Sequence, residues 1–433
     1  MANKSERICI IGGGPAGVAA AMYLQNKGYE NYEIYEKLWK VGGSIYSPKI
    51  YMNARDYAFE TGDISAKIST DFIKDAEEFT NEKFKSENQN LRLIDSLNNE
   101  IYPFNIKKEF SFKKFFYNKR LKKEIEKLKR IIDNPDNEDL SLTFKEFCKK
   151  KKLKKISEYL SLSIIPFSNG QIDDIAAVFV INRLKNYDIY DIKNMNLTLW
   201  DEGAQNIFKR INEDLIHPAN VNSEVRKVQH PAPGTLGKIK VTIRYKGNER
   251  VEEFDKLILA GDFDEYAKYS DIADEGKKIF ERIKYKGLVS FLAVFADGKN
   301  PDKSGYIYEN RCIENNGHAF MILKNRDDIK DNCPCTVYAC RNDEISLDEN
   351  LILMANDINA LGYHVKERLY EQEIRCFPYL TFDEGNDISF TKLDKLQGKQ
   401  NTYYIGNILD SISPEGICAS SKEIVERFFP KDE

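Results

Sequence analysis

"RICIIGGGPAGVAAAMYL" (Arg7–Leu24) is the stretch that decides the fold. Its apolar start, Ile8–Ile11, predicts a short buried strand, and its alanine-rich end predicts a helix. Between them, three glycines follow the G-x-G-x-x-G spacing. The first permits a tight turn, the second lets backbone approach a pyrophosphate, and the third lets the helix pack closely on the strand. The segment therefore predicts a dinucleotide held at a helix N-terminus. The contacts expected in this turn are Gly12, Gly13, Gly14, Ala16 and Gly17.

A second strand, "YEIYEK", follows the helix and ends in an acidic residue. Glu36 stands nineteen positions after Gly17. A carboxylate at this spacing accepts hydrogen bonds from ribose hydroxyls, which favours an adenosine without a 2′-phosphate. We therefore expect Glu36, with its neighbour Lys37, to contact the adenosine half of the dinucleotide.

The composition is that of a soluble globular protein. The 433 residues are 42% hydrophobic and 31% charged, and this length predicts two or three domains. The N-terminus is polar and the apolar runs are short, so we expect neither a signal peptide nor a membrane span. None of the eight cysteines forms a CxxC pair; the nearest pattern is the "CPC" of Cys333–Cys335. We therefore expect reduced thiols in a cytoplasmic protein, and no metal.

The charge is uneven along the chain. Residues 107–155 carry 18 Lys and Arg against 8 acids, although the whole chain has a net charge of -4. Within this segment Leu121, Ile125, Leu128 and Ile132 recur at helical spacing, which predicts a helix with one apolar and one basic face. The alternatives stay open: a solvated helix packed on the core, weak peripheral contact with an anionic membrane surface, or attraction of anionic substrates. We expect no nucleic-acid partner, because no recognition motif accompanies the positive charge.

Three further motifs resemble the flavoprotein amine oxidase superfamily. They are the glycine pair of "LWKVGGSIYS", the "FETGD" of Phe59–Asp63, and the C-terminal "TYYIGNILDSISPEGICASSKEIVERFF". The resemblance implies FAD. The glycine pair would pass close to its pyrophosphate, the Glu-x-Gly loop would run near the flavin ring, and a helix beginning near Gly416–Ile417 would face flavin N1 and C2=O.

The resemblance also implies which residues contact FAD beyond the first turn. Val225 would contact adenine through its backbone, and Gly406 would lie beside the ribityl chain. Asn407 stands where the superfamily usually has an acid, so it would hydrogen-bond ribityl hydroxyls without adding charge. The further contacts implied are Gly43, Ser44, Gly62, Asp63, Val225, Gly406, Asn407 and Ile417.

One branch of this superfamily is more similar still: the polyenoic fatty acid isomerases, which include bacterial linoleate isomerase. The specific stretches are "LTLWDEGAQNIF", "RCFPY" and the C-terminal "SKEIVERFF". Such enzymes move hydride from a bis-allylic carbon to flavin N5 and return it at another carbon, giving a conjugated diene. This implies an FAD-dependent isomerase in which no protein side chain is the catalyst. The alternative is an amine oxidase or dehydrogenating oxidoreductase that passes its electrons to oxygen.

The same resemblance implies a site for a free polyunsaturated fatty acid. An arginine would bind the carboxylate with two parallel hydrogen bonds, assisted by a neighbouring side chain. Counting from matched motifs places these roles at Arg92 and Ile192, where Ile192 replaces an aromatic residue of the family. Phe377 and Tyr379, from "RCFPY", are candidates for the cavity wall.

The expected fold class is α/β, with a Rossmann-type FAD domain assembled from distant segments. Residues 1–75, 195–270 and 395–433 would form the FAD domain around a parallel sheet. Residues 76–194 would form a mainly helical substrate or cap domain. Residues 271–394 would form a mixed-sheet substrate domain, with a helix near 348–361 on one face. We expect the chain to work as a monomer or a homodimer.

Overall fold

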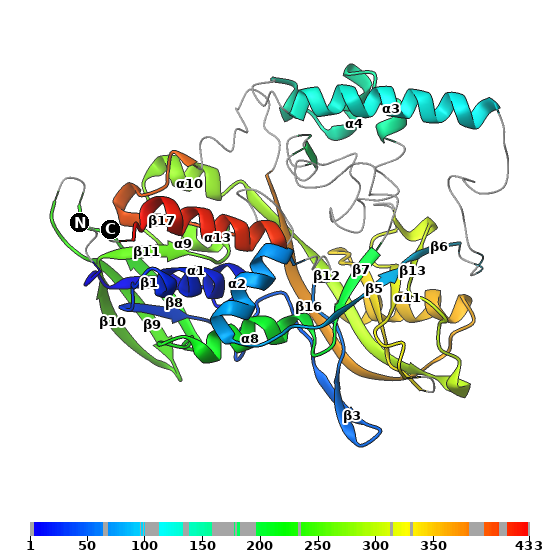
Figure 1. Cartoon of the computed structure of the whole chain (residues 1–433), viewed down its shortest axis with the longest axis horizontal. Helices are drawn as coiled ribbons and strands as arrows, with labels where there is room; N and C mark the ends of the chain where they lie inside the picture. Colours follow the sequence, from blue (N-terminus) through cyan, green and yellow to red (C-terminus); the bar gives the residue numbers. More distant parts are fainter. Residues whose placement is uncertain are drawn as a thin grey trace.

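The computed structural model divides the chain into a Rossmann-type lobe, a second β lobe and a helical cap, with the two termini side by side (Figure 1). It describes residues 4–63, 68–95, 97, 99, 112–132, 138–157, 177, 180–181, 196–232, 235–311, 315–329, 332–380, 394–406 and 414–431.

The Rossmann-type lobe is built on a four-stranded parallel sheet in the order β17-β11-β1-β2. Its strands come from the beginning, the middle and the end of the chain, as expected. Most of their residues are buried, as is typical of parallel strands; the partly exposed ones are Glu33 and Lys256. The strands are β1 (Ile8–Ile11), β2 (Tyr32–Tyr35), β11 (Lys256–Leu259) and β17 (Thr402–Tyr404).

The two faces of this sheet bury different elements. Ile8 and Ile10 pack in one hydrophobic cluster with helices, while Cys9 and Ile11 pack in another with a three-stranded antiparallel sheet. The alternation follows from the two-residue period of a strand. The helices are α1 (Pro15–Asn26), α2 (Thr70–Thr80), α8 (Ala204–Asp214) and α13 (Pro414–Phe428). The small sheet comprises β8 (Ser223–Gln229), β9 (Ile239–Tyr245) and β10 (Asn248–Phe254).

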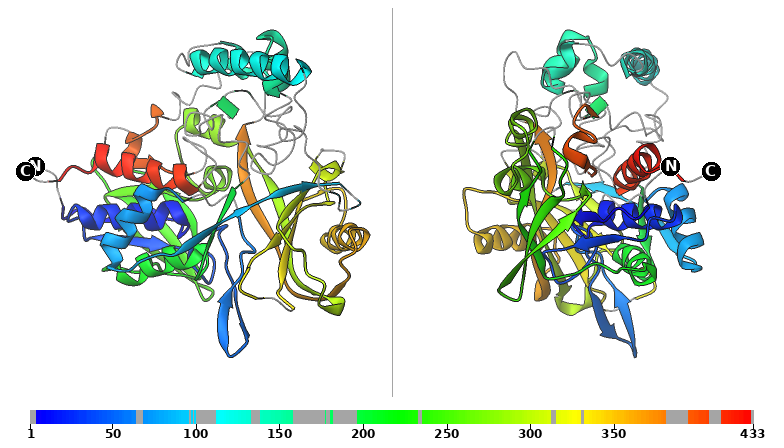
Figure 2. Two further views of the ribbon diagram at one scale, coloured as in Figure 1. Left: turned by 45° about the vertical axis from the view of Figure 1, so that its right-hand side comes forward. Right: turned by 90° about the vertical axis from the view of Figure 1, so that its left-hand side faces the viewer.

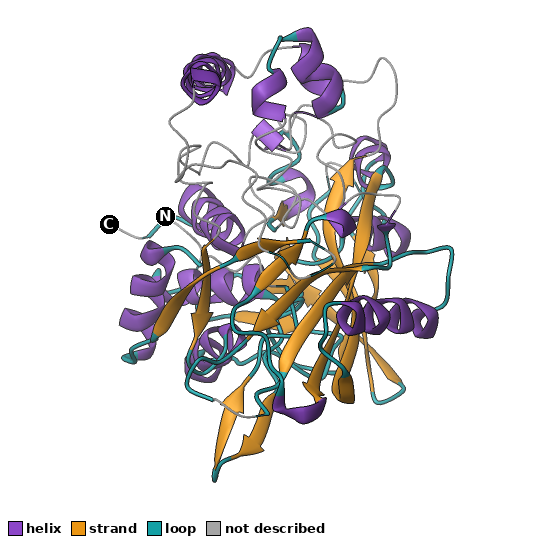
Figure 3. Cartoon of the chain, turned by 90° about the vertical axis from the view of Figure 1, so that its right-hand side faces the viewer, coloured by secondary structure: helices purple, strands orange, loops and turns teal. Residues whose placement is uncertain are grey.

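The second β lobe is a six-stranded mixed sheet in the order β16-β12-β15-β14-β13-β6. Helix α11 (Leu347–Ala360) covers one face through Leu351, Met354 and Ile358, which confirms the expected helix (Figure 3). The strands are β6 (Arg92–Ile94), β12 (Ile283–Phe295), β13 (Gly305–Ile307), β14 (Ala319–Lys324), β15 (Cys335–Cys340) and β16 (Val365–Leu380).

The segment expected to be mainly helical, 76–194, differs from that expectation at its start. Strand β5 (Ser86–Asn90) pairs with β7 (Asn196–Trp200), and β6 completes the six-stranded sheet. The sequence of β5, "SENQN", is polar, so it is the pairing with β7 that makes it a strand. The remaining elements are the hairpin β3 (Lys49–Met52) and β4 (Arg55–Ala58), which projects from the body (Figure 2), and the short helices α9 (Phe263–Tyr269) and α10 (Asp274–Phe280).

The helical cap contains α3 (Phe112–Ile132) and α4 (Phe144–Lys150). Leu121, Ile125 and Leu128 of α3 are buried in one cluster with residues of α4, which confirms the amphipathic helix. The side chain of Ile132 and the polar residues 133–137 lie outside the described part of the chain. Within the described ranges, no helix is long and apolar enough to cross a membrane.

Candidate functional site: a dinucleotide-sized cavity between the two lobes

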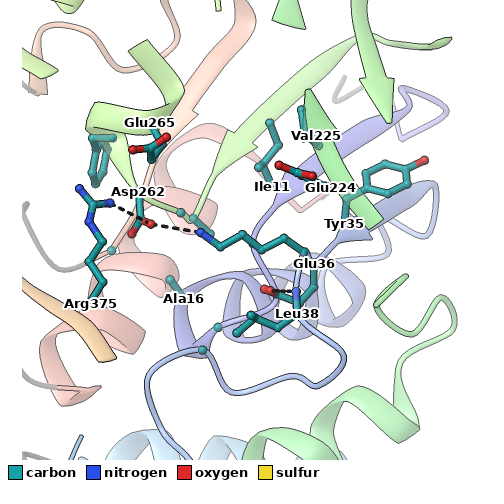
Figure 4. A pocket seen from close by; sticks show the side chains of 18 of the residues that line it. Ile11, Ala16, Tyr35, Glu36, Leu38, Glu224, Val225, Asp262, Glu265 and Arg375 are labelled. Atoms are coloured by element: carbon teal, nitrogen blue, oxygen red, sulfur yellow. Dashed lines mark hydrogen bonds and ion pairs between the residues drawn. The ribbon is translucent and has the colours of Figure 1, made fainter. Parts of the chain in front are cut away.

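A cavity of about 1240 Å³ lies at the carboxyl end of the four-stranded sheet and extends to β16 of the second lobe (Figure 4). Ligands of open α/β sheets bind at this edge, where the loops that follow the strands converge. Ten of the fifteen residues that the sequence assigns to the dinucleotide line the cavity: Gly12, Gly14, Ala16, Glu36, Lys37, Gly43, Ser44, Val225, Gly406 and Ile417.

The glycine turn has the close packing that its spacing predicts. Gly12 has a φ of +109°, and a Cβ on Gly17 would lie 1.9 Å from the Gly12 carbonyl oxygen. Helix α1 begins after Gly14, which offers no side-chain cap, and Pro15 follows as its first residue. The first backbone N–H groups of α1 therefore remain available to an anion in the cavity. Gly13 lies behind this surface.

Glu36 is held in place by two backbone donors. The Gly13 N–H donates to its Oε2 at 2.6 Å, and the Leu38 N–H donates to its Oε1 at 2.7 Å. Burial raises the pKa of Glu36, and the two N–H donors oppose this shift. The β8 strand lies alongside, because the Ser223 N–H donates to the Glu36 carbonyl. Glu36 and Val225 thus line the same end of the cavity.

The glycine pair, Gly42 and Gly43, packs directly against the glycine turn that precedes α1. The Gly42 N–H donates to the Gly13 carbonyl at 2.9 Å, and a Cβ on Gly43 would lie 3.1 Å from the Gly14 Cα. Lys40 completes this loop: its Nζ lies 3.1 Å from the Gly43 carbonyl, and burial lowers its pKa to about 8. The loop thus brings backbone and one cation to the middle of the cavity.

Gly62 and Asp63 support the cavity wall from behind and do not line it. The Asp63 N–H donates to the Ser44 carbonyl at 2.8 Å, and the Gly62 N–H donates to the Tyr46 carbonyl. A Cβ on Gly62 would lie 2.2 Å from the Tyr46 nitrogen, so the Glu-x-Gly loop can pack here only with glycine.

The end of the chain closes the cavity from the opposite side. Gly406, with a φ of +121°, follows β17, and Ile417 lies in the first turns of α13. The helix begins at Pro414, two residues before the expected Gly416. Asn407 lies outside the described residues.

Sequence reasoning missed a chain of ion pairs that connects the two lobes across the cavity. Asp262 Oδ2 lies 3.3 Å from Lys37 Nζ and 3.1 Å from Arg375 Nη1, as the dashed lines in Figure 4 show. Arg375 also pairs with Asp264, and its guanidinium lies 4.1 Å from the Tyr285 ring centroid. The position of Asp262 just after β11 was a usable signal. The sequence contains no signal that Arg375 contacts Asp262.

The expected substrate residues are less completely described. Arg92 lies in edge strand β6, where its Nη2 is 3.5 Å from the Tyr363 hydroxyl, and it is not among the residues that line the cavity. Leu93 shares a hydrophobic cluster with Ile374 of the cavity wall, whereas Arg92 alternates with Leu93 and faces the side of α11. Ile192 and the side chains of Phe377 and Tyr379 lie outside the described part. The backbone of both aromatic residues belongs to β16.

Comparison with known proteins identifies the fold. A family model of an NAD(P)-binding Rossmann-like domain matches residues 10–71. The CLA-producing fatty acid isomerase from P. acnes superposes with a TM-score of 0.83 at 24% identity, covering 99% of this chain and 100% of that one. Putrescine oxidase bound to putrescine superposes with a TM-score of 0.67 at 13% identity, covering 98% of each chain.

Cyclohexylamine oxidase from Brevibacterium oxydans is also similar, with a TM-score of 0.66 at 12% identity over 98% of this chain and 99% of that one. No curated protein matches this chain by sequence. The aligned regions cover nearly the whole of this chain in each case. The chain therefore has the α/β fold of these enzymes, with a Rossmann-type domain at its N-terminus.

Proposed function

We propose that this protein is an FAD-dependent isomerase of polyunsaturated fatty acids. The observation that carries the proposal is that the glycine turn, the glycine pair, Gly406 after the last strand and Ile417 of the C-terminal helix all line one cavity. FAD fits this surface. Glu36 and Val225 would hold the adenosine, the glycine turn and glycine pair would hold the pyrophosphate, and Gly406 and Ile417 would flank the flavin. The end-to-end likeness to a fatty acid isomerase supports this choice of reaction.

FAD, when bound, supplies the hydride acceptor and donor for moving a double bond. The chain's own residues bind, orient and exclude water. The N–H groups at the start of α1 balance pyrophosphate charge. At the β16 end, Phe263, Tyr285, Tyr370 and Ile374 give the cavity wall aromatic and apolar surface against which a hydrocarbon chain can be held. An enzyme of this kind needs orientation and a dry site, and no nucleophile or general base from the protein.

An amine-oxidising enzyme is the second candidate, because amine oxidases share the fold. One local observation favours it: the rings of Tyr46 and Tyr370 lie 5.1 Å apart beside the cavity. Aromatic faces attract alkylammonium cations, so such a pair favours an amine over an uncharged hydrocarbon chain.

Turnover without oxygen separates the two candidates. The FAD-loaded protein should convert linoleate to a diene that absorbs in the near ultraviolet, at the same rate in anaerobic and aerated buffer. An oxidase would stop after one reduction of its flavin. Stoichiometric oxygen consumption with a primary amine would refute the isomerase.

We also propose where the substrate comes from. The described residues of the cap expose a basic surface on α3, including Lys122, Lys123 and Arg130, while the rest of the chain is acidic. This charge distribution suits weak, peripheral contact of a cytoplasmic protein with an anionic membrane, from which free fatty acid is taken.

A further inference from the structure

Glu60, in the Glu-x-Gly loop, has its carboxyl group buried at the junction of the two lobes. It is 8% exposed. Its Oε1 accepts the Ala204 N–H at 2.7 Å, at the first residue of α8, and its Oε2 accepts the Ser47 hydroxyl at 2.7 Å. One side chain thus joins the loop to a helix N-terminus and to the segment that follows the glycine pair. The dinucleotide proposal gives this carboxyl group no role.

The backbone around Glu60 is bonded to the second lobe. The Glu60 N–H donates to Asn325 Oδ1 at 2.7 Å. Its carbonyl accepts the Thr336 hydroxyl at 2.6 Å and the Tyr338 hydroxyl at 3.0 Å. The next carbonyl, of Thr61, accepts the Ser290 hydroxyl at 2.7 Å. The loop is therefore attached to the six-stranded sheet by its backbone and to the Rossmann-type lobe by the Glu60 carboxyl group.

The bonds of the Glu60 carboxyl group and the bonds of the loop backbone both connect to residues at the cavity wall. The Ser47 hydroxyl accepts the Gln205 N–H, and the Gln205 amide donates to the carbonyl of Val41, which precedes the glycine pair. On the other side, Gln372 of the cavity wall donates to the Thr61 carbonyl.

This network also explains the Trp200–Gly203 turn, "WDEG". Gly203 has a φ of +82°, and a Cβ there would lie 2.3 Å from the Ser47 Cβ. Glycine at this position therefore lets the start of α8 lie close to Ser47, and both groups bond to Glu60. Two neighbouring motifs, 13 positions apart, and a third that lies 144 positions further along the chain meet at one carboxyl group.

We propose that Glu60 is a positioning residue for the flavin site. Its carboxyl group sets the spacing between the glycine-pair loop and the β16 wall, and thereby the gap that the flavin ring enters. This inference rests on the proposed FAD site, and it assigns to Glu60 no contact with the cofactor or the substrate.

The test compares Glu60→Gln, Glu60→Ala and Ser47→Ala with the wild type. Glutamine can accept from the Ala204 N–H and donate to the Ser47 hydroxyl, so Glu60→Gln should bind FAD within about twofold of the wild type. Glu60→Ala leaves two buried donors without an acceptor and should weaken FAD binding by about ten- to a hundredfold. Ser47→Ala removes one of the two hydrogen bonds and should fall between them.

FAD affinity is measured by fluorescence titration of the apoprotein, and the environment of the ring by visible circular dichroism. Glu202→Gln is the matched control: it lies in the same turn, is exposed and pairs with Lys49, so it should change neither reading. Thermal unfolding of each apoprotein shows whether a variant has lost its fold; Ser47→Ala decides the question if Glu60→Ala does not fold.

The outcomes separate this inference from the proposed function. If the wild type does not bind FAD, the proposed function fails. If the wild type binds FAD and the folded alanine variants bind it with unchanged affinity and spectrum, only the role of Glu60 fails. An equal loss of FAD affinity in Glu60→Gln and Glu60→Ala would also overturn the proposed role of Glu60. The charge of the carboxylate, and not its hydrogen bonds, would then position the loop.

Discussion

At the scale of single residues, two carboxyl groups in this protein are buried for different purposes. Glu36 faces the cavity with backbone donors on both oxygens. Glu60 lies behind the wall, with one backbone and one hydroxyl donor. Burial raises the pKa of Glu60 to about 7, and its two hydrogen bonds oppose the shift. The hydrogen bonds of Glu60 position the loop, while its negative charge destabilises the fold.

The pH dependence of stability follows from this pKa. A carboxyl group with a raised pKa in the folded state stabilises the fold only while it is protonated, so its contribution falls as pH rises from about 4.5 to about 7. Glu60→Gln lacks this titration. The melting temperature of Glu60→Gln relative to the wild type should therefore rise between pH 5 and pH 8, by the equivalent of about 3 kcal/mol at most.

Scanning calorimetry across this range checks the expectation. Burial raises the pKa of Tyr338 well above its usual value, so this neighbour of Glu60 stays protonated across the range. Lys40, whose pKa is lowered to about 8, is present in both proteins, so its titration cancels in the difference. A constant difference in melting temperature would show that Glu60 has the same protonation state throughout.

Arg92 gives a second prediction at this scale. If it anchors the substrate, the hydrocarbon must reach from the cavity wall past the edge strand β6 to its α11 side, where Arg92 lies. Arg92→Ala should then raise the KM for free linoleate by about tenfold or more, because a charge-assisted pair is lost, and leave the KM for its methyl ester unchanged. Equal effects on acid and ester would remove Arg92 from the carboxylate role.

At the scale of elements, the packing of α1 on β1 determines whether the dinucleotide site exists. Gly17 allows this contact, because any side chain there would meet the Gly12 carbonyl. Gly14 has a different reason to be glycine. Its φ of -73° is ordinary, and an added Cβ would meet the Gly43 Cα only at 3.7 Å. The fold therefore leaves room for a side chain at Gly14, and that side chain would lie at the surface of the cavity, where we expect the pyrophosphate.

These two glycines predict separable effects. Gly17→Ala should lower the stability of the apoprotein by about 1–3 kcal/mol and abolish FAD binding, since α1 must move away from β1. Gly14→Ala should leave the melting temperature of the apoprotein nearly unchanged and weaken FAD binding. Thermal unfolding and flavin fluorescence measure both quantities. A Gly14→Ala protein that binds FAD normally would place the pyrophosphate elsewhere.

At the scale of the whole molecule, the cap concentrates positive charge at one end of an acidic protein (Figure 1). The apolar side of α3 is already buried against α4, so contact with a membrane must be electrostatic. Such contact weakens as salt screens the charges. The chain should therefore sediment with vesicles that contain phosphatidylglycerol at low salt, and neither at high salt nor with pure phosphatidylcholine.

Charge reversal localises this contact. Lys122→Glu, Lys123→Glu and Arg130→Glu together should abolish vesicle binding and leave turnover of detergent-dispersed linoleate unchanged. The matched control reverses three exposed lysines on the other lobes, Lys246, Lys299 and Lys366, and should bind vesicles as the wild type does. If the cap variant binds the vesicles as well as the wild type does, the basic face of α3 is an ordinary solvated surface and does not contact the membrane.

Much of the Rossmann-type lobe, and the mixed sheet and covering helix of the second lobe, could be predicted, because their patterns are local. The run Ile8–Ile11, the glycine spacing and Glu36 lie within thirty residues of one another. The spacing of this motif predicts the strand, the turn and the helix directly. Strand β5 could not be predicted, since its polar residues form a strand only against β7. The same holds for the contact of Asp262 with Arg375, 113 positions apart in the sequence.

The sequence by itself determined that a dinucleotide turn opens this chain, that the C-terminal segment belongs with it, and that a basic amphipathic helix lies between. The turn and the helix follow from residue spacing, which sets which side chains share a turn or a face, whereas the place of the C-terminal segment was implied by its resemblance to the flavoprotein amine oxidase superfamily. Only the tertiary structure decided that Glu60, Ser47 and Ala204 meet, and that Arg92 lies at a sheet edge outside the described cavity. Contacts of this kind depend on how distant segments pack, because the sequence positions of two residues do not determine the distance between them once the chain has folded.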